Sequence, residues 1–231
     1  MNEPSTFATN IDRRRSVGKV LALLFFLATV IGVVVLLTLL AQVVIEGYPW
    51  LSRNFLTEFP SRFPEEAGVL SALVGTLWLM LLTGAISVPL GVGTAVYLEE
   101  YASDTWYARI VQTNIANLAG VPSVIFGMLG LAIFVRFMAL GPSLLSGALT
   151  MSLLILPIII ISTKEALRAV PDGIRESAYA LGATRWQVVR SHLLPSAAPG
   201  ILTGVILSLS RAIGETAPLL VIGVATMAPF L

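Results

Sequence analysis

The chain has 231 residues, of which 56% are hydrophobic and only 12% are charged, and its formal net charge is +1. Soluble domains carry about 25% charged residues, so this composition excludes a soluble globular protein and predicts one embedded in a bilayer. The near-neutral charge gives no basis for nucleic-acid binding, and the absence of cysteine with a single histidine leaves no set of metal ligands. No cofactor or metal is expected.

Five apolar segments are long enough to cross a bilayer, which takes roughly 20 residues of helix. The sequence therefore predicts an all-α, polytopic helical bundle. The predicted spans cover residues 20–45, 69–98, 111–135, 144–163 and 200–227.

Several of these spans contain residues that disturb a regular helix. Pro89 and the glycines near it are expected to bend the second span close to one end, and Pro157 to kink the fourth. The third span contains Asn114, Asn117 and a central Gly-Val-Pro-Ser at 120–123.

Basic residues set the orientation, because Lys and Arg concentrate on the cytoplasmic side of membrane proteins. Alternation places residues 1–19 and the polar segment 164–199 on the same side of the membrane, and both are rich in Lys and Arg. The N-terminus and this segment are therefore expected in the cytoplasm. The apolar run after the first arginines is too long for a secretory signal.

The polar segment is expected to form two helices. The first begins after Pro171, with Asp172 as its cap, and runs to Leu181 with Ile174 and Ala178 on the same face as Leu181. Gly182 suits the left-handed position that ends such a helix.

The second helix is expected to start at Thr184, with Gln187 three residues on as a capping box. Its apolar face carries Trp186, Val189 and Leu193, and prolines at 195 and 199 are expected to interrupt it before the last span. Periodicity leaves two alternatives open: the pair of helices packs on its own bundle, or it docks on a partner protein.

Arg211 and Glu215 lie inside the last predicted span, where charges are costly and face a bundle interior or water. Arg211 lies eleven residues after Gly200, roughly 16 Å along a helix, which is near the middle of the hydrocarbon core. Glu215 follows at i+4 and is expected on the same helix face. The two side chains form either a structural ion pair or an anion site in which Arg211 attracts the anion.

Other candidates are weaker. Arg136, at the outer end of the third span, either meets an arriving anion or anchors the helix at the interface. Ser123, after Pro122, either presents free backbone N–H groups to an oxyanion or marks a packing kink. Glu99, Glu100 and Asp104 are expected to form a solvated turn.

Two motifs resemble a known family. Residues 176–183, Glu-Ser-Ala-Tyr-Ala-Leu-Gly-Ala, resemble the EAA loop of ABC importer permeases, with Ser177 in the place of the consensus alanine. Residues 211–220, Arg-Ala-Ile-Gly-Glu-Thr-Ala-Pro-Leu-Leu, resemble the signature of the phosphate-specific permeases of PstA type. The likeness covers about residues 68–223.

The resemblance implies a type I ABC importer permease with a MetI-like fold and a coupling helix that docks on an ATPase. The residues that it places in this coupling helix are Glu176, Ser177, Ala178, Ala180 and Gly182. It also implies three kinds of partner: a PstC-like permease, a dimer of PstB-like ATPases, and a PstS-like phosphate-binding protein. Family members have six spans, so one further span is expected beyond the five found.

The implied organisation is a cytoplasmic tail at 1–19, a first transmembrane helix at 20–45, and a permease core at 68–227 containing the coupling loop 164–199. The protein is expected in the inner or plasma membrane, as the permease of an ATP-driven phosphate importer. It is not expected to be an enzyme itself, since the sequence has no P-loop of the form GxxxxGK[ST].

Three alternatives remain. In the first, the protein is a permease for another oxyanion, such as sulfate, molybdate or phosphonate, because an arginine binds all of them. An intramembrane enzyme would need a second catalytic group beside Glu215. A membrane scaffold would leave the cost of Arg211 and Glu215 unexplained.

Overall fold

The computed structural model describes residues 11–63, 67–102 and 105–224, and every regular element within these ranges is helical. The all-α prediction is therefore confirmed. The α-helices are α1 (Ile11–Gly47), α2 (Arg53–Thr57), α3 (Leu70–Val96), α4 (Trp106–Ala119), α5 (Ser123–Gly130), α6 (Leu144–Arg168), α7 (Asp172–Ala180), α8 (Arg185–Val188), α9 (Leu194–Ile213) and α10 (Ala217–Ile222). Shorter helical turns are η2 (Tyr48–Trp50) and the π-helical η4 (Tyr97–Tyr101), η5 (Leu131–Phe137) and η6 (Val189–Leu193).

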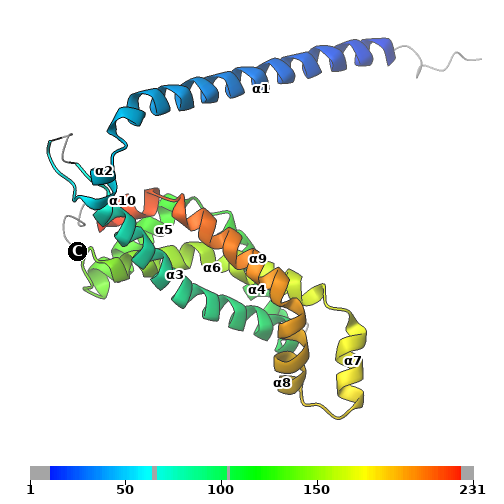
Figure 1. Ribbon diagram of the computed structural model, residues 1–231. Helices are drawn as coiled ribbons and strands as arrows, with labels where there is room; N and C mark the ends of the chain where they lie inside the picture. The colour runs from blue at the N-terminus through cyan, green and yellow to red at the C-terminus, as the bar shows by residue number, and fades with distance from the viewer. Residues whose placement is uncertain (1–10, 64–66, 103–104, 225–231) are drawn as a thin grey trace, which may run out of the picture.

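Helix α6 is the centre of the bundle, with α3 and α9 packed along it and α4 and α5 also in contact (Figure 1). Ser143 caps its start in a reciprocal capping box with Ser146. Small residues let the neighbouring helices approach closely. A methyl group added to Gly91 of α3 would overlap Ile159, and one added to Gly204 of α9 would overlap Ser162.

Four single helices are long and apolar enough to cross a membrane, and a bent pair gives a fifth if it counts as one span. The second and fourth predicted spans correspond to α3 and α6, and α3 is a continuous helix through Pro89.

The third predicted span is broken at residues 120–122, as its Gly-Val-Pro-Ser sequence indicated, but the bend is sharper than a packing kink. The helical segments Trp106–Ala119 and Ser123–Phe137 meet at an angle of 106°. The physical reason is the sequence at the break, because Pro122 lacks an N–H and also keeps the residue before it out of the helical region.

The bounds of the fifth predicted span are wrong. Helical structure runs unbroken from Arg185 to Ile213, so Pro195 and Pro199 do not separate the second polar helix from the span. Pro195 closely follows the π-helical turn η6, and such a turn is a local adjustment that continues a helix past an irregularity. The helix then ends at Ile213, α10 follows, and residues 225–227 of the predicted span lie outside the described part.

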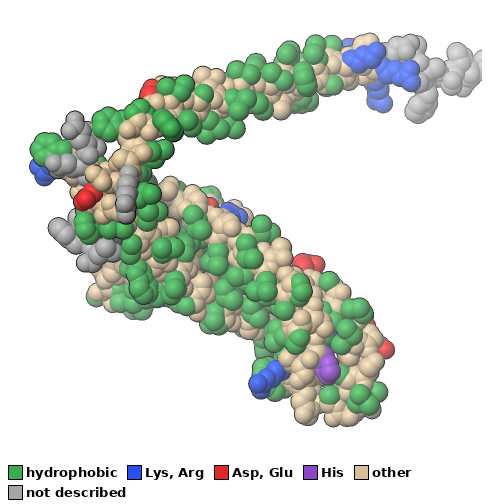
Figure 2. Space-filling view, in the orientation of Figure 1, with side chains coloured by type: hydrophobic (Ala, Val, Ile, Leu, Met, Phe, Trp, Pro, Cys, Tyr) green, Lys and Arg blue, Asp and Glu red, His purple; other side chains and the backbone are tan. Residues whose placement is uncertain are grey.

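Helix α1 contains the first predicted span and stands apart from the bundle (Figure 1). Its most apolar window has a mean hydropathy of 3.1 and is 0% buried. Figure 2 shows apolar side chains around the helix and the basic side chains gathered at its N-terminal end. Such a helix is stable only with lipid or another apolar surface around it.

Candidate functional site

The polar segment forms two helices joined by a glycine turn at one end of the bundle. Helix α7 ends at Ala180, and Gly182 takes a left-handed conformation with φ of 82°. Thr184 then caps α8 in a capping box with Gln187. The predicted pattern of helix, glycine and capped helix is therefore confirmed in its elements.

Helix α7 turns only part of its predicted apolar face inward. Ala178 is buried and Ile174 is half-buried, but Leu181 is 89% exposed because the chain leaves the helix at that residue. Asp172 does not cap the helix, since it lies in the first helical turn and pairs with Arg175.

The residues that the resemblance assigns to a coupling helix divide into two groups. Ala178 packs against the bundle and supports α7, whereas Gly182 ends the helix at the surface. Glu176, Ser177 and Ala180 are exposed, and the Ser177 hydroxyl donates to the Gly173 carbonyl at 2.6 Å. The apolar side chains of Tyr179, Leu181 and Trp186 in the same segment are also exposed.

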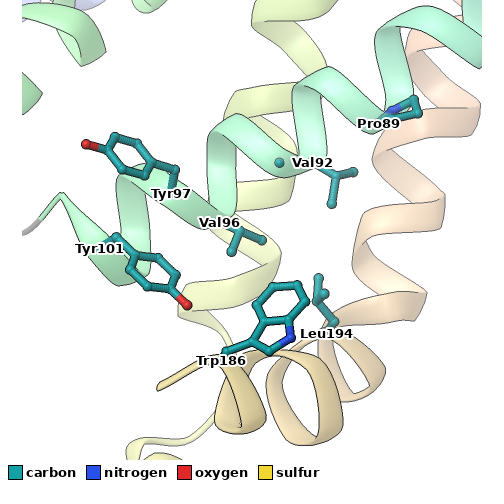
Figure 3. Close-up of a pocket in the computed structure, with 8 residues that line it drawn as sticks. Pro89, Val92, Val96, Tyr97, Tyr101, Trp186 and Leu194 are labelled. Carbon is teal, nitrogen blue, oxygen red and sulfur yellow. The ribbon is translucent and has the colours of Figure 1, made fainter. Parts of the chain in front are cut away.

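Helix α8, the start of α9 and the end of α3 line an open apolar cavity of about 470 Å³. Figure 3 shows Trp186 and Tyr101 approaching this cavity from two different elements. Val189 and Leu193, which were predicted on the same face as Trp186, are fully buried, while Trp186 is half-exposed. The lining is apolar, so the cavity is unsuited to a phosphate ion.

Arg175 fastens α7 to the end of α3. Its guanidinium lies 3.1 Å from Oε1 of Glu100, on η4, and 3.0 Å from Oδ1 of Asp172. It also donates to the carbonyls of Leu167 at 3.0 Å and Val170 at 3.1 Å. This single side chain therefore connects η4, the end of α6 and helix α7.

A second cluster surrounds the neighbouring carboxylate. Glu99 Oε1 accepts a hydrogen bond from Arg168 Nε at 2.8 Å, and Glu99 Oε2 lies 3.8 Å from Lys164 Nζ. The expectation of a solvated turn is therefore wrong for Glu99 and Glu100, whose side chains are 17% and 8% exposed. Asp104 lies outside the described residues.

Arg211 and Glu215 meet at the other charged site. The Arg211 Nε lies 3.7 Å from Glu215 Oε1, with side chains 52% and 21% exposed. They do not share a helix face as predicted, because α9 ends at Ile213 and Glu215 lies in the turn that follows. The two side chains still form an ion pair because this turn keeps Glu215 close to Arg211. The backbone N–H of Glu215 donates to the Ala212 carbonyl at 3.1 Å.

The packing of α9 on α6 fixes the depth of this ion pair. Gly200 lies against Ala166 and Gly204 against Ser162, so the two helices are antiparallel. If these contacts are extended along the two antiparallel helices, Arg211 lies beside the middle of α6. Helix α9 therefore ends beside the middle of α6, and its last turn carries an exposed arginine with a carboxylate partner.

Two helix breaks are connected by packing. Helix α5 follows the break at 120–122 and α10 follows the break at 214–216, and these two helices pack on each other. Gly127 makes this contact, since a methyl group there would meet Pro218 and Val221. Irregular backbone at membrane depth is tolerated where it is buried in protein or lines a water-filled cavity.

Ser123 and Arg136 lie at opposite ends of the segment formed by α5 and η5. Ser123 is the first residue of α5, at the break, and is half-buried. Arg136 is exposed in the last turn of η5, roughly 20 Å further along at the rise of a helix. The structure therefore does not bring Arg136 to Ser123.

Sequence reasoning missed a polar row on α4. Arg109, Thr113 and Asn117 recur every four residues and are all exposed, while Ala108 on the opposite face is buried. The signal was present as a helical period of polar residues inside an apolar segment. Within the described residues, no group of three or more His, Asp or Glu could hold a metal ion.

These features define a helical membrane protein with a polar two-helix loop at one end and broken, charged helices within its bundle. The chain belongs to the family of binding-protein-dependent transport system inner membrane components, whose model matches residues 87–229. That match begins inside α3 and includes both breaks and the two-helix loop.

Relatives cover most of the chain. The probable ABC transporter permease protein YqgI of Bacillus subtilis is 35% identical over 207 residues, which are 90% of this chain and 70% of the relative. The phosphate transport system permease protein PstA of Mycobacterium leprae is 38% identical over 216 residues, 91% of this chain and 70% of the relative. The predicted resemblance to PstA-type permeases is therefore confirmed.

A solved structure shares the fold. An inward-facing conformation of the MetNI methionine ABC transporter superposes with a TM-score of 0.54 at 24% identity, over 64% of this chain and 68% of that chain. At this level of identity the likeness shows the fold alone, and it confirms the MetI-like fold that the resemblance implied.

Proposed function

We propose that the chain is the permease subunit of an ATP-driven importer of inorganic phosphate. The observation that carries this proposal is the ion pair of Arg211 and Glu215, beside the middle of α6, in a chain 38% identical to a phosphate transport permease. Arginine suits a tetrahedral oxyanion because its planar fork donates two hydrogen bonds at once. Glu215 holds Arg211 until phosphate competes for it.

The polar loop is the proposed docking surface for a cytoplasmic ATPase. Exposed apolar side chains at Leu181, Tyr179 and Trp186 support this role, because water-exposed apolar groups in a charged loop gain free energy when a partner covers them. The subunit itself hydrolyses no ATP in this scheme. Nucleotide-driven movement of the ATPases reaches the spans through α7 and shifts the bundle between its two facing states.

The membrane orientation follows from the same proposal. The tail at 1–19 and the loop 164–199 lie in the cytoplasm, and the bundle sits in the inner or plasma membrane. The basic end of α1 and the basic residues of the loop support this orientation through the positive-inside rule. The proposed core is 68–227 and the proposed partners are a PstC-like permease, a PstB-like ATPase dimer and a PstS-like binding protein.

Uptake of radiolabelled phosphate by the reconstituted complex tests the cargo, with sulfate as competitor. Phosphate uptake that depends on ATP and that excess sulfate does not reduce is the expected result. Uptake of sulfate, molybdate or phosphonate in preference to phosphate would show that the cargo is a different oxyanion, and the proposed role as a permease would still hold. A complex that moves none of these anions would overturn the proposed function.

A further inference from the structure

The outward face of α4 carries polar side chains at a level where a span normally meets hydrocarbon. The inward face of the helix, with Ala108, Val111 and Ile115, packs in one cluster with Leu156 and Ile160 of α6. These α6 residues belong to its apolar stretch, so the middle of α4 lies at the same depth. The opposite face is exposed in the described structure.

Three polar side chains on this face differ in how well they are satisfied. The Thr113 hydroxyl donates to the Arg109 carbonyl at 2.9 Å, and the Asn114 amide donates to the Ile110 carbonyl at 2.9 Å. Within the described residues the Asn117 side chain has no hydrogen-bond partner, although it is exposed. An amide that faces hydrocarbon without a partner costs several kcal/mol, so lipid does not cover this face.

The same face ends at irregular backbone. Trp106, Arg109, Ile110, Thr113 and Asn114 border a shallow, open part of the surface of α4. At the other end of the row lies the break, where Gly120 and Pro122 are both exposed. Exposed irregular backbone at this depth requires water or protein against it.

We propose that the row Arg109, Thr113 and Asn117, with Asn114 beside it, lines a water-filled path for the anion. This inference rests on the proposed transport function and extends it to a second helix. An anion prefers the chemistry of this row, since Arg109 supplies positive charge and the asparagine amides supply N–H donors. No acidic side chain interrupts the row in α4 to repel an anion.

Burial against the second permease would also satisfy these side chains. The Asn117 amide and the exposed backbone at the break favour the path, because water satisfies such groups without a matched protein partner for each of them. The two possibilities differ in one measurable property, which is the access of water to the row.

Cysteine accessibility measures this property directly, because the chain contains no cysteine. The variants are Thr113→Cys and Asn117→Cys, each in the complex reconstituted with its partner subunits. The matched control is Leu118→Cys, on the same helix and 44% exposed, but about 100° around the helix from Asn117. The probe is a small anionic methanethiosulfonate presented on both sides of the membrane.

We expect the cysteines at 113 and 117 to react at least about tenfold faster than the one at 118, because only a hydrated thiol ionises to the reactive thiolate. Millimolar phosphate should slow their reaction and leave position 118 unchanged. Equal, slow reaction at all three positions would overturn the inference in favour of a protein-covered face. Phosphate uptake of each variant is measured in parallel. Fast labelling at 113 and 117 in a complex that transports no phosphate would contradict phosphate as the cargo but support a water-filled path along α4.

Discussion

Arg175 of α7 and Glu100 of η4 form an ion pair of 3.1 Å whose side chains are 17% and 8% exposed. Helix α7 is connected to α6 and α8 through the chain itself, but only side-chain contacts connect it to α3. Among the described residues, this pair is one of two ion clusters that link the end of α3 to the polar segment and the end of α6. A displacement of α7 therefore pulls on α3 through Arg175.

Replacing Glu100 with Gln should loosen this connection. Arg175 would keep Asp172 and two carbonyls but lose its buried carboxylate, and breaking one partner of a buried pair costs up to about 3–5 kcal/mol. We expect a lower thermal unfolding midpoint and fewer phosphate ions imported per ATP. The control is Glu165→Gln, whose side chain is 68% exposed and pairs with Arg168 only at 3.8 Å. Equal midpoints and equal coupling ratios for the two variants would refute the role of the pair.

The sequence predicted helices more reliably than the contacts between them. The Thr184 capping box and the Gly182 turn depend on neighbours within three residues, and both were predicted correctly. Glu99 and Glu100 looked like a solvated turn because their partners, Arg168 and Arg175, lie about 70 residues further along the chain. A local sequence pattern cannot predict an ion pair between residues so far apart in the chain.

The breaks inside the bundle show a second limit. Pro122 indicated an irregularity in the helix. The angle of 106° is set by the packing of α5 on α6 and α10, and the periodicity of the sequence carries no information about that packing. The depth of Arg211 was counted from Gly200, although the helix begins earlier. Its position beside the middle of α6 follows instead from the close contact of Gly204 with Ser162.

Arg211→Ala should reduce phosphate uptake at least about tenfold while the complex still assembles, because hydrogen bonds to charged groups contribute about 1.5–3 kcal/mol each. Arg211→Lys should recover only part of the rate, since an ammonium lacks the planar fork. The control is Arg62→Ala, an exposed arginine in the segment before α3. Radiolabelled uptake with assembly checked by co-purification makes the comparison. Normal uptake by Arg211→Ala would assign the ion pair a purely structural role.

Gly182→Ala should destabilise the turn between α7 and α8 by about 1–2 kcal/mol, because a side chain disfavours the left-handed conformation at φ of 82°. Gly173→Ala is the matched control, since it lies within α7 with nothing near its added methyl group. That change should leave the helix as stable or make it more stable. Limited proteolysis of the loop compares the two, and faster cleavage is expected for Gly182→Ala alone.

Leu181→Asp should weaken binding of the proposed ATPase without lowering the stability of the chain. Leu181 is 89% exposed, so the bundle loses no packing, whereas a partner that buries a leucine gains about 1.5–3 kcal/mol. Ala180→Asp, at an exposed neighbour, should act in the same direction. Co-purification of the ATPase measures the effect, with Ser196→Asp as an exposed control at the start of α9. Equal recovery of the ATPase with all three variants would rule out docking through this surface.

Gly91→Ala should destabilise the bundle, although the sequence indicated this glycine only as one of the residues expected to bend the second span. A methyl group there would overlap Ile159 of α6, and overpacking of a tight interface costs about 1–3 kcal/mol. Gly75→Ala, on the same helix, adds a methyl group with nothing within 4 Å and should be neutral or stabilising. Thermal unfolding in detergent distinguishes the two variants. A midpoint for Gly91→Ala as high as that of Gly75→Ala would mean that α3 and α6 pack less closely than their glycine contact indicates.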